Sequence, residues 1–216
     1  MTGTVESSRP PAAAPGEARP RRARWLGWAG RVPRAARWCA LVAFLNAAVW
    51  AAITPVFHVP DETSHVAYLQ YFAETGKVPN LPNGDGISHE EALVMDQLRF
   101  NDTIGNTGEL APFTEVQQRG LDAVERQNPG RASGGGIIQT SSQPPLYYAL
   151  GAVIYKLSPW QDLTDRVLLI RLLSALCAAA TTLFVFMFLR ELFTEPWTWT
   201  VGALAVAVQP MFGFMA

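Results

Sequence analysis

Three long stretches without a charged residue constrain the fold of this 216-residue chain more than any other feature. They cover residues 38–57, 172–189 and 197–216. A helix rises 1.5 Å per residue, so about 20 residues cross the ~30 Å hydrocarbon core of a bilayer. A single stretch of this kind also occurs in the core helices of soluble proteins. Three of them in one short chain instead predict a polytopic α-helical membrane protein.

From these stretches we predict transmembrane helices at 37–57, 167–190 and 197–216, the last cut short by the end of the chain. Residues 143–157 are a shorter fourth candidate, whose Lys156 can extend to the interface. The sequence therefore predicts about four transmembrane helices. Because the chain ends inside the last apolar stretch, we expect it to be the N-terminal part of a longer protein.

Charge is sparse and unevenly distributed. Charged residues make up 16% of the chain, against about 25% in ordinary soluble domains. Residues 1–37 contain eight Arg and two Glu, whereas residues 58–142 contain twelve acidic and five basic residues. The positive-inside rule then predicts a plasma (inner) membrane protein with a cytoplasmic N-terminus and an extracytoplasmic segment 58–142. With a second crossing at 143–157, Arg166 and Arg171 would lie in an inner turn.

The N-terminal residues 1–36 are rich in Pro, Ala, Gly and Arg and show no apolar periodicity. We predict a disordered basic arm held near anionic lipid. An alternative interpretation takes residues 1–57 as a long signal peptide, because residues 47–51 offer small residues for cleavage. The apolar stretch exceeds the 7–15 residues usual in such peptides, which favours an uncleaved anchor.

The segment 58–142 is far longer than a connector requires, and long loops usually carry function. Residues 61–75 are predicted to form an amphipathic helix lying on the outer leaflet, and residues 90–100 and 114–126 shorter helices. Pro60 ends the first span and leaves Asp61 in position to cap the new helix.

Two neighbouring carboxylates, Asp61 and Glu62, and one histidine, His65, begin this helix. The simplest interpretation makes Asp61 a cap, Glu62 a partner of the helix dipole and His65 a surface residue. The three side chains leave open a divalent cation as cofactor, but the pattern predicts no definite metal site. Cys39 and Cys177 lie inside apolar stretches, which excludes a disulfide framework or a four-cysteine zinc site.

Three motifs resemble a known group of enzymes: VPDETSH at 59–65, SSQPPLYYALGAVIYKL at 141–157 and RVLLIRLLSALCAAATTLFVFMFLREL at 166–192. They are similar to the N-terminal part of the GT-C-type membrane glycosyltransferases, including protein mannosyltransferase-like and aminoarabinose transferase-like groups. A similar pattern, Pro-Asp-Glu-x-x-His followed by Pro-Pro-Leu-Tyr-Tyr, marks a related family of bacterial membrane proteins of unknown function.

The resemblance implies transfer of a sugar from a polyprenyl-phosphate donor to a cell-envelope glycan, lipid or protein on the outer face. In that superfamily a carboxylate just after the first span acts in catalysis; Asp61 matches it as general base, with Glu62 beside it. Since such enzymes have more spans, we expect this chain alone to be inactive. Four further residues are candidates for substrate binding, although tyrosines also form the ordinary aromatic belt: His65, Gln143, Tyr147 and Tyr148.

A second hypothesis assumes the same membrane architecture but no catalytic activity. The protein would then be a non-catalytic polytopic membrane protein in envelope polymer assembly or transport, with Asp61 and Glu62 only stabilising a helix. Under either hypothesis the partners are the lipid bilayer and envelope components, and no nucleic acid is expected.

Overall fold

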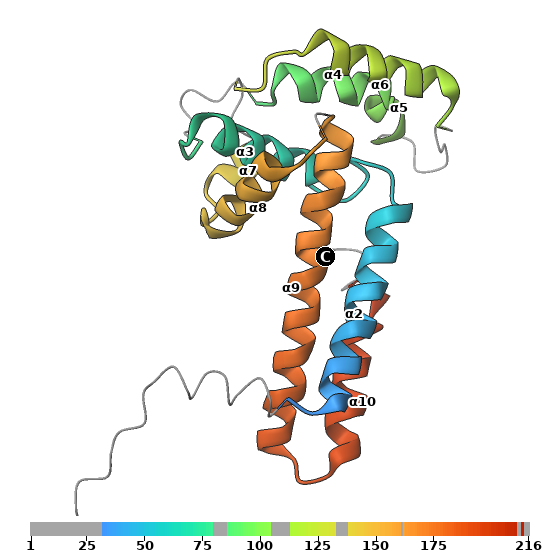
Figure 1. Ribbon diagram of the computed structural model, residues 1–216, viewed down its shortest axis with the longest axis vertical. Coiled ribbons are helices and arrows are strands. Elements are labelled where there is room, and N and C mark those ends of the chain that lie inside the picture. Colours follow the sequence, from blue (N-terminus) through green and yellow to red (C-terminus); the bar gives the residue numbers. More distant parts are fainter. Residues whose placement is uncertain are drawn as a thin grey trace, which may run out of the picture. The chain divides into compact units, whose positions relative to one another are not determined.

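The computed structural model describes residues 32–79, 86–104, 113–132, 138–160, 162–210 and 213, and the regular elements in these ranges are all α-helices (Figure 1). The chain divides into two units, residues 1–34 and 35–216, of which the second is described here. The basic arm predicted over 1–36 lies outside the described residues as far as residue 31. The predicted α-helical fold class is confirmed for the described residues.

Within the described ranges, two helices are long and apolar enough to cross a membrane: α2 (Arg34–Ile53) and α9 (Leu163–Leu192). A third helix, α10 (Pro196–Ala207), packs against α9, and these three run side by side in Figure 1. The Nδ2 of Asn46 in α2 donates to the carbonyl of Ala207 in α10 at 3.1 Å. The sequence-predicted spans at 37–57 and 167–190 thus correspond to helices of sufficient length. We refer to α2, α9 and α10 as the bundle.

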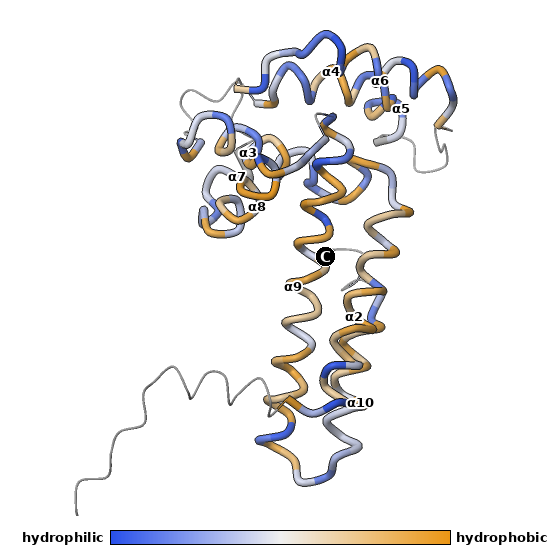
Figure 2. Tube along the Cα trace, viewed as in Figure 1, coloured by the Kyte–Doolittle hydropathy of each residue, from blue (hydrophilic) through white to orange (hydrophobic). Residues whose placement is uncertain are grey.

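Helix α2 of the bundle places small side chains inside and large apolar ones outside. The buried side of α2 repeats every three or four residues: Ala36, Cys39, Ala43, Ala47 and Ala51. Its exposed apolar side is formed by Trp38, Leu41, Leu45, Val49 and Ile53. Orange, hydrophobic residues run along most of α2 and α9 in Figure 2. Small residues at helix contacts and large apolar residues outside are typical of helices packed in lipid.

The remaining helices form what we call the outer layer: α3 (Glu62–Thr75), α4 (His89–Gln97), α5 (Phe100–Ile104), α6 (Glu115–Gln127), α7 (Ile138–Ser141) and α8 (Leu146–Leu157). The helix predicted at 90–100 is divided into α4 and α5. The helix predicted at 114–126 is α6, where Thr114 and Gln117 form a capping box. The span predicted at 143–157 is α8, which has only 12 residues.

Helix α3 differs from the sequence prediction in two respects. It is buried on several sides, including at Glu62, Ser64 and Gln70, and it packs against α8. The buried residues of α3 therefore lie on more than the one apolar face that the sequence predicted. The side chain of Asp61 also makes no cap hydrogen bond, because the residue has a left-handed backbone with φ 59°.

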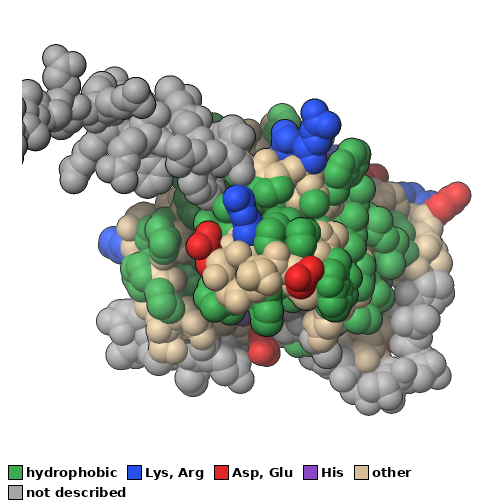
Figure 3. Space-filling model, turned by 90° about the horizontal axis from the view of Figure 1, so that it is seen from below, with side chains coloured by type: hydrophobic (Ala, Val, Ile, Leu, Met, Phe, Trp, Pro, Cys, Tyr) green, Lys and Arg blue, Asp and Glu red, His purple; other side chains and the backbone are tan. Residues whose placement is uncertain are grey.

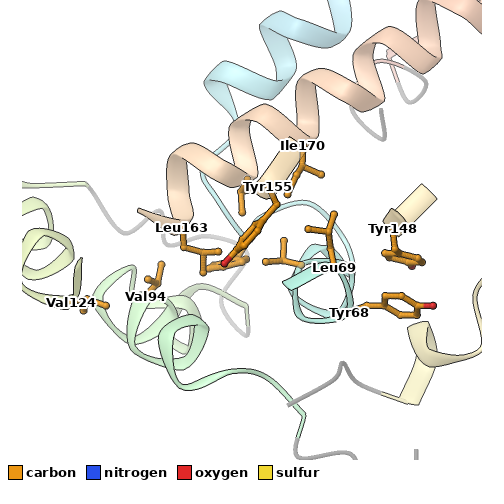
Figure 4. Packing of buried hydrophobic residues seen from close by; sticks show 11 residues of the cluster. Tyr68, Leu69, Val94, Val124, Tyr148, Tyr155, Leu163 and Ile170 are labelled. Atoms are coloured by element: carbon orange, nitrogen blue, oxygen red, sulfur yellow. The ribbon is translucent and has the colours of Figure 1, made fainter. Parts of the chain in front are cut away.

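An aromatic and aliphatic cluster forms the core of the outer layer (Figure 4). The rings of Tyr68 in α3 and Tyr148 in α8 are stacked with centroids 3.7 Å apart. Tyr155 of α8 lies between α3 and the start of α9, where Leu163 and Ile170 join the cluster. This core fixes α3, α8 and the first turns of α9 against one another.

Candidate functional site

A cavity of about 780 Å³ lies between α2, α3, α8 and α9. Most of its lining is apolar, with a few polar side chains from α3, α9 and the start of α8. Five of the six sequence-predicted site residues line it: Glu62, His65, Gln143, Tyr147 and Tyr148. The sixth, Asp61, is exposed between Pro60 and Glu62, which both line the cavity.

The most extensive polar contact of the cavity is an ion pair that joins Glu62 to Arg171 of α9. Nε of Arg171 lies 2.6 Å from Oε1 of Glu62, and Nη2 lies 2.7 Å from Oε2. Both side chains are 9% exposed. Such a two-point pair is the strongest geometry available between a guanidinium and a carboxylate.

Arg171 also binds the end of α2. Its Nη1 donates to the carbonyls of Ala51 and Thr54, and its Nη2 to the carbonyl of Pro55. With the two bonds to Glu62, all five N–H groups of the guanidinium are used. Arg171 therefore satisfies the free carbonyls at the C-terminus of α2 and ties that end to α3.

Glu62 is held in place by this arrangement. Its Oε2 accepts a third bond from the backbone N–H of Phe57, at 2.6 Å. A carboxylate with one guanidinium and one backbone partner is poorly placed to take a proton from a substrate. Of the two predicted catalytic carboxylates, the geometry thus leaves Asp61 as the one that is free to react.

His65 and Tyr148, both predicted from the sequence to bind substrate, form a hydrogen bond with each other. Nδ1 of His65 lies 2.7 Å from the Tyr148 hydroxyl, with the two rings nearly parallel. Although His65 is exposed at the cavity, desolvation of its ring lowers its pKa from the ordinary 6.5, against the opposing charges of Asp61 and Glu62. The imidazole is therefore neutral at neutral pH.

Tyr147 and Gln143 occupy different positions in the lining. The Tyr147 hydroxyl lies 2.6 Å from Oγ of Ser174 in α9, so this tyrosine connects α8 to α9 and is not simply an interfacial residue. Gln143 is exposed, just before α8 begins. The sequence analysis did not select Ser174 or Arg171, because both lie in an otherwise apolar helix with no local motif.

The cavity continues from these polar groups along α9. Its lining extends from Arg171 to Thr181, about 15 Å along the helix axis. The α2 residues that line this region are Ala47, Trp50 and Ala51. The site thus has a polar part beside α3 and an apolar part within the bundle.

A second polar cluster lies in the outer layer, next to the aromatic core. Nε2 of Gln70 donates to Glu90 at 2.6 Å and to the Tyr155 hydroxyl at 3.1 Å. Arg131 pairs with Glu90 at 2.8 Å. Beside them Glu91 is completely buried, and among the described residues neither of its carboxyl oxygens has a hydrogen-bond partner. Sequence analysis identified this stretch only as a helix.

Neither cluster provides a metal site. In the part of the chain that the structure describes, no three His, Cys, Asp or Glu side chains are grouped to hold a metal ion. The three candidate ligands at the start of α3 are separated by their contacts, with Glu62 bound to Arg171 and His65 to Tyr148. Cys39 and Cys177 are both free.

The described residues contain two helices of membrane-spanning length, α2 and α9, with large apolar side chains exposed on their surfaces. These features are typical of α-helical membrane proteins. Residues 44–216 match the family described as "Predicted membrane protein (DUF2142)", and the chain belongs to this family. No curated protein and no solved structure matches the chain. The family description states a membrane location and no activity.

Proposed function

We propose that this protein is a membrane glycosyltransferase that transfers a sugar from a polyprenyl-phosphate donor to a cell-envelope acceptor, with Asp61 as general base. One observation carries the proposal: Asp61 is an exposed carboxylate in a left-handed backbone, without a capping bond, directly beside the cavity. Non-glycine residues in this backbone region cost about 1–3 kcal/mol and cluster at functional sites. The adjacent Glu62, in contrast, has a complete set of structural partners.

The shape of the cavity supports a lipid-linked substrate. Its apolar part follows α9 into the bundle, where a prenyl chain would lie, and its polar part adjoins α3, where the sugar phosphate would lie. Ligand sites of this size are usually apolar with a few polar groups that fix orientation. Gln143 and Tyr147 would provide such groups for the sugar.

In the proposed reaction, Asp61 accepts the proton of the acceptor hydroxyl while that oxygen attacks the anomeric carbon. The bond between the anomeric carbon and the phosphate oxygen breaks, and the lipid phosphate leaves with the electron pair. Within the described lining the basic residues are Arg171, whose donors are all used, and His65, which is neutral. Charge neutralisation of the phosphate would therefore rest on a divalent cation or on residues outside this lining.

The test is transfer of radiolabelled sugar from a panel of polyprenyl-phosphate donors in membranes that express the full-length gene. Asp61→Asn is the informative variant, since Asn tolerates a left-handed backbone and no cap bond is lost. We expect normal amounts of folded protein and activity reduced at least about 100-fold, as for removal of a general base.

The matched control is Glu62→Gln, one residue away. It should reduce the amount of folded protein, because it removes the charge that pairs with Arg171. If Asp61→Asn retains full activity while the wild type transfers sugar, Asp61 is not the base. If no donor in the panel is used, the enzyme proposal loses its support.

A second candidate function is that of a non-catalytic membrane protein in envelope polymer assembly or transport. The ion pair of Glu62 with Arg171 favours it, because half of the Asp-Glu motif then has a purely structural role. In both proposals the basic N-terminus is cytoplasmic and the outer layer is extracytoplasmic, in the plasma membrane.

A further inference from the structure

We infer that α8 does not cross the membrane but lies along its surface, on the same side as the outer layer, so that α9 is the second crossing. This differs from the sequence prediction of a span at 143–157. It is independent of the proposed catalytic activity.

The first argument is length. Helix α8 contains 12 residues, or about 18 Å, against the ~30 Å of the hydrocarbon core. After it, Ser158 is extended, and α9 begins at Leu163. The segment therefore lacks the helical length of a crossing.

The second argument is that α8 is bound to α3 along its length. Near its start, Tyr148 bonds His65; near its end, Tyr155 bonds Gln70 and Lys156 pairs with Glu74 at 2.7 Å. Gly151 lies at the closest approach, where an added Cβ would come within 2.3 Å of Leu69. Helix α3 carries buried polar residues and directly follows α2, so a helix fixed beside it remains at the same level.

The third argument concerns the number of crossings between α2 and α9. Arg171, near the start of α9, binds both Glu62 and the carbonyls at the end of α2. The chain therefore returns to the side on which α2 ends before α9 begins. One crossing by α8 would place Arg171 on the opposite side from Glu62, as the sequence analysis expected, and the ion pair excludes that arrangement.

The exposed face of α8 indicates what covers it. The side toward α3 is buried, whereas the opposite side is a strip of exposed apolar residues at helical spacing: Leu146, Leu150, Val153 and Leu157. Leu146 is 73% and Leu157 77% exposed. Seen from below, hydrophobic side chains cover much of the face that the molecule presents (Figure 3).

The occupant we assign to this strip is the boundary between lipid headgroups and acyl chains. An amphipathic helix buries its apolar face about 5–10 Å into that boundary. Lys156, in the last turn of α8, and Trp160, in the connection to α9, are residue types that anchor helices at an interface. The strip would extend the lipid contact already expected for the exposed faces of α2 and α9.

Single cysteines in the full-length protein test the topology, in a background with Cys39→Ala and Cys177→Ala. Pro159→Cys lies between α8 and α9, Glu125→Cys is in α6, and Thr194→Cys is between α9 and α10; all three positions are exposed. A membrane-impermeant thiol reagent is applied to intact cells and, separately, to permeabilised cells.

We expect Pro159→Cys and Glu125→Cys to label in the same preparation, and Thr194→Cys in the opposite one. This pattern supports the inference whichever face is extracellular. If α8 crossed the membrane, Pro159→Cys would label in the opposite preparation to Glu125→Cys, and Thr194→Cys, after the further crossing by α9, in the same preparation as Glu125→Cys. Any pattern in which Pro159→Cys and Glu125→Cys label in opposite preparations would overturn the inference. Labelling of all three cysteines in one preparation would also overturn it, because α9 would then not cross.

A nitroxide label at Leu150→Cys tests the lipid contact. We expect oxygen to increase the spin-relaxation rate of this label more than a water-soluble nickel complex does. The same order is expected at the reference position Leu45→Cys, on the exposed face of α2. Stronger relaxation by the nickel complex would show that the strip faces water. Protection from both reagents would show that protein covers it, and either result would overturn the assignment to lipid.

Discussion

The bundle and the outer layer bury different kinds of side chain. The buried residues of α2 are four alanines and one cysteine, whereas α3 and α4 bury Glu62, Gln70, Glu90 and Glu91. Large apolar residues form the exposed side of α2, whereas aromatic rings lie inside the outer layer. Helix α2 and the outer layer thus bury opposite kinds of side chain within one chain.

The physical reason lies in the surroundings. Lipid is as apolar as leucine, so helices within it associate by close packing of small residues. Helices that contact water can instead bury aromatic residues with a gain in free energy. The buried charges of the outer layer are stable only where each has a partner, so removing one partner is costly. The outer layer and its junction with α9 should therefore be the more sensitive region to polar substitution.

The largest loss of folding stability is expected for Arg171→Gln. The change leaves Glu62 charged and buried, and it frees the carbonyls of Ala51, Thr54 and Pro55. Loss of one partner of a buried ion pair costs about 3–5 kcal/mol. We expect a marked fall in the unfolding temperature of the purified protein in detergent, together with loss of folded protein in the membrane.

Arg190→Gln is the matched control, since Arg190 is exposed at the other end of the same helix. It should change the unfolding temperature little, as most surface substitutions stay within about 0.5 kcal/mol. Equal effects of the two substitutions would show that Arg171 does not fasten α2 to α3.

The elements that sequence predicted well depend on local patterns. The uncharged stretches indicated α2 and α9, and the helix predicted at 61–75 agrees with α3 to within one residue at its start. Helix signals act within one or two turns, so they can be read without knowledge of the fold.

The parts that sequence did not predict depend on contacts between distant residues. Glu62 and Arg171 are 109 positions apart, and Arg171 appeared only as a charge beside an apolar stretch. The role of Asp61 depended on a backbone conformation that no local pattern specified. The contacts of α8 with α3, on which our inference about α8 rests, likewise join residues far apart in sequence and leave no local signal in residues 143–157.

A second comparison replaces one glycine by alanine in each region, Gly151 in the outer layer and Gly202 in the bundle. An added Cβ at Gly151 would meet Leu69 at 2.3 Å, and one at Gly202 in α10 would meet Leu189 at 2.5 Å. Leu69 is buried in the outer layer, whereas Leu189 is only partly buried and can move toward lipid. We expect Gly151→Ala to cost about 1–3 kcal/mol, as overpacking does, and Gly202→Ala clearly less.

Thermal unfolding of both variants, beside wild type, measures the difference. A larger loss for Gly202→Ala would mean that the bundle is the tighter of the two contacts, and the contrast between the regions would then be wrong. Equal losses of stability would mean that the Leu69 side chain can move aside for the added Cβ as easily as the Leu189 side chain can.

The smallest expected effect concerns Glu91, which should make the folding stability depend on pH. Its carboxyl is completely buried, and no residue in the described part of the chain gives it a hydrogen bond. Burial, followed by the neighbouring charges of Glu90 and Glu62, raises its pKa well above the ordinary value. The folded protein therefore keeps Glu91 protonated where the unfolded chain has already released the proton.

Stability should consequently fall as pH rises through the ordinary glutamate range, near 4.3, and should continue to fall until the raised pKa in the folded state is passed. One proton contributes at most about 1.4 kcal/mol per pH unit to this slope. Glu91→Gln preserves the shape of the side chain and removes the proton, so its unfolding temperature should vary less with pH above that range. Glu125→Gln, exposed on α6, should leave the slope unchanged. If Glu91→Gln keeps the wild-type slope, another group titrates in this range, and the unpartnered carboxyl of the outer layer is not what distinguishes it from the bundle.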